Sequence, residues 1–270
     1  MTIDTVLIGP EPRIAVDLAG PEDAPVVLFL HGIGGNRTNW RRQLEALSGR
    51  YRAAAWDARG YGGSDDGPDA FAFTDFADDV VRALDHLGAD RAHVVGLSMG
   101  GRIALDLWRR HPARVRTLTL ADTSAGSKET AAPEKVEAFL AARRKPLLEG
   151  KTTADIALDV AATLAGPEIA PEVHAELIAS LSALRAGPYI RTLEAVTRFT
   201  GFPDPATIDV PALIIVGEHD RVAPPHVAQA MADAIPGAEF QIIPGAGHIS
   251  NLERPDAFDA ALLGFLTRHP

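Results

Sequence analysis

The sequence contains no cysteine and no long hydrophobic run. Without a thiol the chain can form no disulfide bond, no cysteine nucleophile and no sulfur-ligated metal site. The longest clean apolar run, residues 24–30, is far shorter than the roughly 20 residues that a helix needs to span a bilayer. The N-terminal segment also lacks the basic and apolar regions of a secretory signal peptide. We therefore expect no membrane partner and a cytoplasmic location.

Positive charge is scarce: 26 basic residues stand against 36 acidic ones, which gives a net charge of −10. Such a chain repels a phosphate backbone, so we expect no nucleic-acid partner. Aromatic residues make up only 6% of the 270 residues, but 46% are hydrophobic, which is typical of a folded globular protein. This length fits one large α/β unit with an extensive core.

Short β-rich runs alternate along the chain with amphipathic segments of helical periodicity. Several of the β-rich runs are apolar on both faces, as strands buried between two helix layers must be. This alternation predicts an α/β fold with a mostly parallel central sheet and helices on both faces. The expected strands cover residues 13–18, 26–30, 52–56, 93–97, 117–121, 212–216 and 239–243.

One long stretch interrupts this alternation, because only helical spacing occurs in it. Turn-rich segments flank the stretch on both sides. We therefore expect a helical cap domain at residues 124–205, inserted between two late strands of a core domain at residues 1–123 and 206–270. Apolar stripes on the cap helices need cover, so side chains such as Phe139 and Phe199 are expected to roof a pocket in the core domain.

The segment from Gly96 to Gly101 predicts a nucleophile. It reads Gly-Leu-Ser-Met-Gly-Gly, follows a predicted strand directly and opens an amphipathic run. A serine at such a strand–turn–helix junction has a strained backbone, and small residues two positions before and after it let the strand and helix approach. The hydroxyl of Ser98 would then lie at a helix N-terminus, where backbone amides stabilise developing negative charge. Ser98 is therefore our candidate nucleophile.

A serine nucleophile needs a base within hydrogen-bond reach and a carboxylate that orients this base. Asp220 and His248 each follow a predicted strand, so we expect both side chains near Ser98 at the carboxyl ends of the strands. His248 is the candidate base and Asp220 the candidate acid. Asp122, which follows the strand 117–121, is the alternative acid.

The negatively charged oxygen of a tetrahedral intermediate needs hydrogen-bond donors. Two backbone amides are candidates: Ile33, in the loop after the strand 26–30, and Met99, directly after the candidate nucleophile. His31, at the start of that loop, is expected to have a structural role. The sequence has no glycine motif for a dinucleotide or nucleotide and no histidine pair with metal-ligand spacing, so it implies no cofactor and no metal.

Together these motifs, over about residues 13–266, resemble the α/β-hydrolase superfamily, and the order of nucleophile, acid and base along the chain matches that of its triad. The segments 98–101, 220–225 and 246–255 are most similar to 3-oxoadipate enol-lactonases and related carboxylesterases. The resemblance implies a serine hydrolase that cleaves a small carboxylic ester or (enol-)lactone through an acyl-enzyme on Ser98. Haloalkane dehalogenases and epoxide hydrolases, which place an aspartate at that position, are excluded.

The sequence leaves several alternatives open. Carbon–carbon bond hydrolysis and cofactor-free perhydrolysis use the same triad and differ in pocket shape, and a ligand-binding sensor could keep the triad without turnover. The natural substrate and the oligomeric state, a homodimer included, are not fixed either. Six basic residues of the cap could bind a substrate carboxylate or could form a solvated surface: Arg143, Arg144, Lys145, Arg185, Arg191 and Arg198.

Overall fold

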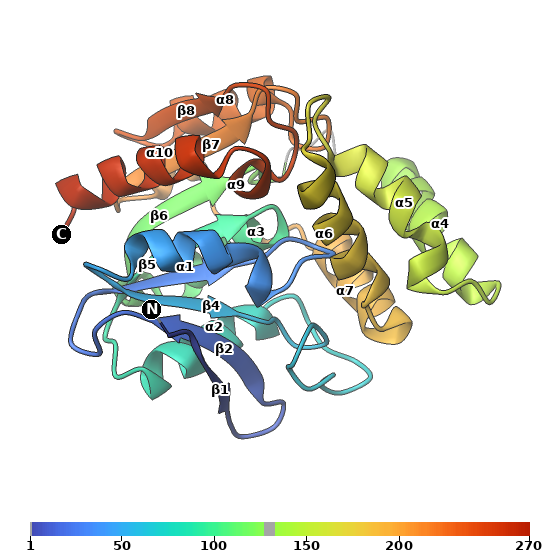
Figure 1. Ribbon diagram of the computed structural model, residues 1–270, viewed down its shortest axis with the longest axis horizontal. Coiled ribbons are helices and arrows are strands. Elements are labelled where there is room, and N and C mark those ends of the chain that lie inside the picture. The colour runs from blue at the N-terminus through green and yellow to red at the C-terminus, as the bar shows by residue number, and fades with distance from the viewer. Residues whose placement is uncertain (1, 127–132) are drawn as a thin grey trace.

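The structure is a computed structural model that describes residues 2–126 and 133–270 (Figure 1). Within these residues, eight strands form one sheet: β1 (Asp4–Ile8), β2 (Ile14–Ala19), β3 (Val26–Leu30), β4 (Arg52–Trp56), β5 (Ala92–Leu97), β6 (Val115–Ala121), β7 (Ala212–Gly217) and β8 (Glu239–Ile243). The strand order is β1-β2-β4-β3-β5-β6-β7-β8. Strand β2 runs antiparallel to both of its neighbours, and all other pairs are parallel. The predicted mostly parallel sheet is therefore confirmed.

Strand β1 was not among the strands that the sequence predicts. It pairs with β2 at the edge of the sheet, and most of its side chains are exposed, including Leu7. An edge strand that buries only one residue fully, Ile8, carries little of the hydrophobic pattern on which strand prediction depends. The seven predicted strands all form, with ends that shift by at most two residues.

Helices cover both faces of the sheet, as expected. Helices α2 (Asp75–His86), α3 (Met99–Arg110) and α8 (Pro225–Ala234) pack on one face, and α1 (Arg41–Leu47) and α10 (Pro255–Arg268) on the other. A short helix, α9 (Ser250–Glu253), precedes α10, and 3-10 turns occur at Arg37–Trp40, Pro112–Arg114 and Pro205–Thr207. None of the helices in the described ranges is long and apolar enough to cross a membrane.

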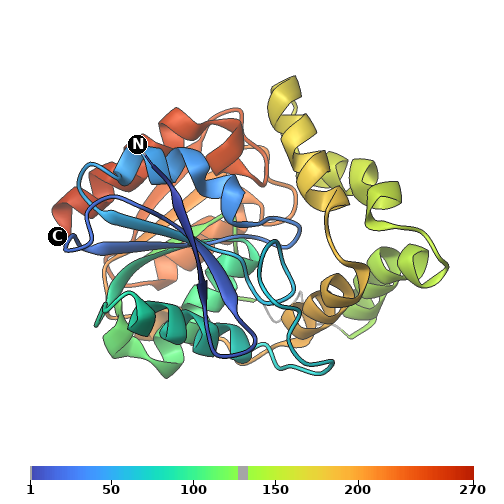
Figure 2. The same ribbon diagram turned by 60° about the horizontal axis from the view of Figure 1, so that its bottom comes forward.

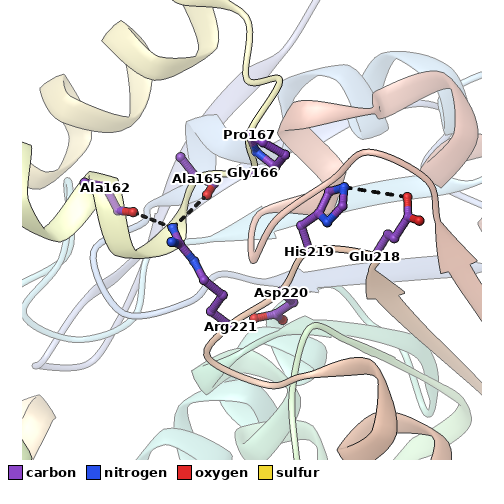
Figure 3. Close-up of a pocket in the computed structure, with 8 residues that line it drawn as sticks. All are labelled: Ala162, Ala165, Gly166, Pro167, Glu218, His219, Asp220 and Arg221. Atoms are coloured by element: carbon purple, nitrogen blue, oxygen red, sulfur yellow. Dashed lines mark hydrogen bonds and ion pairs between the residues drawn. The ribbon is translucent and has the colours of Figure 1, made fainter.

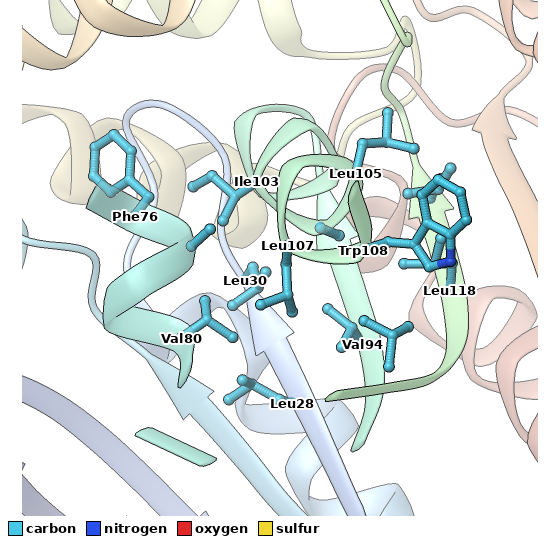
Figure 4. Close-up of a cluster of buried hydrophobic side chains, with 14 of the residues drawn as sticks. Leu28, Leu30, Phe76, Val80, Val94, Ile103, Leu105, Leu107, Trp108 and Leu118 are labelled. Carbon is cyan, nitrogen blue, oxygen red and sulfur yellow. The ribbon is translucent and has the colours of Figure 1, made fainter. Parts of the chain in front are cut away.

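Strand β3 shows how the core is built on both faces. Leu28 and Leu30 pack with α2 and α3 in one hydrophobic cluster (Figure 4), while Val27 and Phe29 pack with α1 and α10 in a second cluster. Successive side chains of a strand point to opposite faces, so an all-apolar strand serves both layers. This double burial fixes the carboxyl ends of the parallel strands, where the candidate site residues lie.

The described residues between β6 and β7 form four helices: α4 (Pro133–Leu148), α5 (Thr153–Leu164), α6 (Pro171–Ser182) and α7 (Ala186–Arg198). We call α4–α7 the helical insertion. It lies beside one end of the sheet, apart from the two layers that cover the faces (Figures 1 and 2). Helices α5 and α6 share one apolar cluster, and α4 and α7 share another. Residues 127–132, at the start of the predicted helical stretch, are outside the described residues.

The two aromatic residues expected above the pocket lie elsewhere. The side chain of Phe139 is 42% exposed and packs against the guanidinium group of Arg143. Phe199 stacks on Phe73, with ring centroids 4.4 Å apart, and contacts Phe202. Helical periodicity identified an apolar stripe, but it could not tell which residue of the stripe faces solvent once two helix pairs form.

Candidate active site

Ser98 lies at the sharp turn between β5 and α3. Its backbone has a φ of 53°, which is an uncommon conformation for a residue with a side chain. A Cβ atom on Gly96 would lie 2.3 Å from the backbone of Gly100. The glycines two positions before and after Ser98 therefore let the strand and helix backbones touch, as the motif predicts. This turn holds the serine hydroxyl above the end of the sheet.

The structure brings Ser98, His248 and Asp220 together. His248 Nε2 lies 2.8 Å from Ser98 Oγ, and His248 Nδ1 lies 2.8 Å from Asp220 Oδ2. The other oxygen of Asp220 accepts hydrogen bonds from the backbone amides of Val222 (2.7 Å) and Ala223 (2.9 Å). With Nδ1–H donating to the carboxylate, Nε2 is left as the acceptor of the serine proton.

The electrostatic surroundings of His248 favour its charged form. Burial alone lowers the pKa of the imidazole, but the hydrogen bond and charge of Asp220, with smaller effects of Asp122 and Glu253, raise this pKa above its ordinary value. Negative charges near an imidazole stabilise the imidazolium ion. The arrangement can therefore accept a proton from a serine hydroxyl and hold it.

The loop after β3 lies directly against the serine. A Cβ atom on Gly32 would lie 3.2 Å from the Cβ atom of Ser98. Within the described ranges, the backbone amides of Ile33 and Met99 donate no hydrogen bond, so both are available to a ligand. His31 fixes this loop, because its Nε2 accepts a hydrogen bond from the Ala58 amide (3.0 Å) and its Nδ1 lies 2.8 Å from the Gly32 carbonyl oxygen.

A small cavity of about 30 Å³ lies beside Ser98 and His248. Its wall is mostly apolar, with Leu97 from the core and Leu164 and Leu177 from the helical insertion. The rest of the wall consists of His31, Gly32, Ile33, Gly34, Gly35, Asn39, Trp40, Ile249, Asn251 and Leu252. Among the described residues that line it are two histidines, His31 and His248, and no aspartate, glutamate, lysine or arginine. The cavity can therefore bind an apolar group but offers no lysine or arginine to a carboxylate.

The chain was also compared with known protein families. A family model described as the alpha/beta hydrolase fold matches residues 25–255, which is most of the chain. The chain belongs to the α/β-hydrolase family.

Several relatives of this α/β hydrolase have names that describe an activity. It is 29% identical to 3-oxoadipate enol-lactonase 1 of Acinetobacter baylyi, over 94% of this chain and 92% of the relative. It is 30% identical to a protein of Caulobacter sp. provisionally named a carbamate hydrolase, over 92% of this chain and 93% of the relative. The structure of a thermophilic esterase of Thermogutta terrifontis superimposes with a TM-score of 0.83 at 27% identity, over 100% of both chains.

Asp122, the alternative acid, is fully buried, but it accepts hydrogen bonds from Gly217 and Ser250 rather than from the histidine. One oxygen accepts a hydrogen bond from the Gly217 amide (2.8 Å), and the other accepts from the amide (3.1 Å) and hydroxyl (2.6 Å) of Ser250. Among the described residues, Asp220 is the only carboxylate within ion-pair distance of the His248 imidazole. Burial, and next the charge of Asp220, raise the pKa of Asp122 to about 7. Asp122 therefore lies beside the three site residues without joining them.

The six basic residues named in the sequence analysis have partners outside the cavity. None of the six lines it, and each makes contacts at the surface of the insertion or with the core loops. The ionic contacts join Arg144 to Glu194, Lys145 to Glu149, Arg185 to Asp66, Arg191 to Asp69 and Arg198 to Glu137, while Arg143 donates to the Thr163 hydroxyl. A solvated surface, and not a carboxylate site, is the role that these contacts fit.

One feature of the site has no counterpart in the sequence predictions. Glu253 is a buried carboxylate that contacts the backbone beside His248, and its partner Gly166 is 87 positions away. No local pattern marks such a contact, because its partner belongs to a different part of the chain.

Among residues 2–126 and 133–270, no group of three or more histidine, aspartate or glutamate side chains could hold a metal ion.

Proposed function

We propose that this α/β hydrolase cleaves small, uncharged carboxylic esters or lactones through an acyl-enzyme on Ser98. The hydrogen-bonded chain from Ser98 through His248 to Asp220 is the observation that carries the proposal. The names of its relatives, an enol-lactonase and an esterase among them, support the same reaction class. A nucleophile, a base and an oriented carboxylate are the groups that acyl transfer requires.

The mechanism follows from which atoms face each other. Ser98 Oγ attacks the carbonyl carbon of the ester while His248 Nε2 accepts the serine proton. The Ile33 and Met99 amides bind the oxygen that becomes negative, and His248 then gives the proton to the leaving alkoxide as the ester bond breaks. Water attacks the acyl-enzyme by the same route, which releases the acid and restores Ser98. Asp220 stabilises the imidazolium ion in both halves of the reaction.

The cavity supports a short and uncharged acyl group. Its volume of about 30 Å³ is far below the roughly 300–1,000 Å³ of ordinary ligand pockets, so the helical insertion or its side chains must move when a substrate enters. Leu164 and Leu177 of the insertion form part of the wall. We propose on this basis that residues 124–205 act as a cap domain over the core domain of residues 1–123 and 206–270.

A fluorophosphonate probe tests the nucleophile directly. We expect one label per chain, on the peptide that carries Ser98, and steady turnover of p-nitrophenyl acetate. Ser98→Ala should abolish the labelling and lower kcat by on the order of 10⁴- to 10⁶-fold. Ser182→Ala is the matched control, because the Ser182 hydroxyl donates to the Ile178 carbonyl oxygen of its own helix and lies outside the proposed site. It should retain both signals.

The outcomes separate the proposal from its alternatives. Labelling that survives Ser98→Ala would show a different nucleophile. A single burst on p-nitrophenyl acetate without a steady state would instead favour a ligand-binding sensor. A panel of neutral esters, lactones, dienone acids and carbamates then compares the substrate classes, and a preference for anionic substrates would contradict the uncharged pocket.

A further inference from the structure

The end of helix α5 is hydrogen-bonded to the loop that carries His248. The backbone amide of His248 donates to the carbonyl oxygen of Leu164, at a distance of 2.8 Å. Leu164 also lines the cavity beside Ser98. We call residues 164–167 the α5 exit segment. This segment is therefore both a wall of the cavity and a backbone support for His248.

Glu253 joins the same two segments through its side chain. One carboxylate oxygen accepts a hydrogen bond from the Gly166 amide (2.9 Å), and the other accepts from the Gly247 amide (3.0 Å). Only 5% of Glu253 is exposed. A buried carboxylate is costly unless hydrogen bonds satisfy it, and here both oxygens have backbone donors from segments far apart in the chain.

The glycines at this junction leave no room for side chains. A Cβ atom on Gly247 would lie 2.3 Å from the Gly166 amide nitrogen, and one on Gly166 would lie 2.6 Å from a Glu253 oxygen. A Cβ atom on Gly217, at the end of β7, would lie 2.0 Å from the Gly247 carbonyl oxygen. The backbone at Gly247 is therefore in direct contact with the backbones of Gly166 and Gly217.

The α5 exit segment is also held from the side of Asp220. The guanidinium group of Arg221 donates to the carbonyl oxygens of Ala162 (2.7 Å) and Ala165 (3.3 Å), across an open cleft of about 510 Å³ (Figure 3). Arg221 directly follows Asp220 in the chain. The loop of the candidate acid and the loop of the candidate base are thus both attached to the end of α5.

We propose that Glu253 is a positioning residue that fixes His248 against the end of helix α5. This inference rests on the proposed function, in which His248 is the base. Glu253 holds the amide of Gly247, the residue directly before His248, at a fixed distance from the α5 exit segment. Because the same segment bears Leu164 of the cavity wall, the position of the base depends on the position of the helical insertion.

The charge of Glu253 distinguishes this role from simple packing. The acidic groups around His248 are Asp220, Asp122 and Glu253, and all three raise the pKa of its imidazole. Burial raises the pKa of Glu253, and its backbone hydrogen bonds and then the charge of Arg254 counteract part of this rise. Arg254 also pairs with the exposed Glu168. A residue that only filled space would contribute no charge to His248.

Glu253→Gln tests the proposal with a side chain of the same size. The amide keeps one acceptor oxygen, but its NH₂ group faces a backbone N–H, so one of the two bonds is lost. We expect faster hydrogen exchange in the peptides that contain residues 164–167 and 245–249. We also expect kcat to fall by on the order of 10- to 100-fold with KM little changed, because a small displacement of a base is costly.

The pH profile gives a readout that packing alone would not change. Loss of the negative charge lowers the pKa of His248, so the acid limb of kcat/KM should move to lower pH. Glu253→Asp keeps the charge but cannot span both amides, so it should increase hydrogen exchange while leaving the acid limb close to that of the parent protein. Glu172→Gln, at an exposed position of α6, is the matched control, and it should change neither measurement.

Each outcome decides the question. An acid limb and a kcat that stay unchanged in folded Glu253→Gln would overturn the proposal. Backbone amide hydrogens of residues 164–167 that exchange as fast as those of an exposed loop in the unaltered protein would also overturn it. The exchange measurement on the unaltered protein also applies if Glu253→Gln does not fold. Labelling of Ser98 by the fluorophosphonate in the unaltered protein tests the proposed function separately, so failure of one does not imply failure of the other.

Discussion

A Cβ atom added to Gly100 would lie 2.0 Å from the carbonyl oxygen of Leu30. The first turn of α3 therefore rests on the end of β3, and this contact brings Ser98 beside the loop of Ile33. Backbone cannot move aside as a flexible side chain can. We expect Gly100→Ala to lower the free energy of unfolding by about 1–3 kcal/mol or more, as overpacking does, and to lower kcat. Urea unfolding and p-nitrophenyl acetate kinetics measure the two effects.

Gly49→Ala is the control for this prediction. Apart from Gly49 itself and its two chain neighbours, no atom of the described residues lies within 4 Å of a Cβ atom placed on Gly49, so the change should be within about 0.5 kcal/mol. Equal losses of stability in the two variants would show that the contact between Gly100 and Leu30 is not tight.

The roles of the two buried aspartates predict unequal losses of activity. Asp220→Asn should lower kcat by about 10⁴-fold, because an amide cannot hold His248 in the tautomer that accepts the serine proton. Asp122→Asn should lower kcat much less, since the Asp122 carboxylate contacts Gly217 and Ser250 and not the imidazole. Steady-state kinetics on p-nitrophenyl acetate compare them. Reversed losses would assign the acid to the end of β6.

The pH dependence of kcat/KM should report the raised pKa of His248. Only the neutral imidazole accepts a proton, so kcat/KM should fall as the pH drops through this pKa. Asp122 contributes to raising it wherever its carboxyl is ionised, which its own pKa of about 7 limits to the upper part of the acid limb. Asp122→Asn should therefore move the acid limb to lower pH, while Asp256→Asn, at an exposed site, should not. A limb that moves upward in Asp122→Asn would contradict the charge effect.

The apolar cavity predicts a preference for short acyl chains, with kcat/KM highest at roughly C2 to C6 for p-nitrophenyl esters. Leu164→Ala removes part of the cavity wall and should shift the preference toward longer chains. Leu158→Ala is the control, because this leucine of the same helix is 61% exposed. A preference that shifts equally in both variants, or in neither, would show that α5 does not limit the acyl group.

The sequence predicted the parts of the site that follow from local motifs. Ser98 could be found because the glycines around it permit one sharp turn, and His248 and Asp220 because each follows a strand at the same edge of the sheet. Their distances confirm that the motifs meet in space. The catalytic roles stay predictions that the experiments above test.

Features that depend on long-range packing could not be predicted in this way. Strand β1 has too little buried surface to produce a pattern, and the exposure of Phe139 depends on how α4 packs against α7. The contacts of Glu253 join segments that have no sequence relationship. Such contacts are fixed by the completed fold, so no window of neighbouring residues contains them.

The helical insertion leaves and re-enters the core at one place. A Cβ atom on Gly126 would lie 2.9 Å from the ring of Phe202, so the two ends of the insertion are neighbours. A loop whose ends already meet can change in length at low entropic cost, about 0.6 kcal/mol for each doubling. This segment can therefore change in length as a module while the sheet beneath it stays the same.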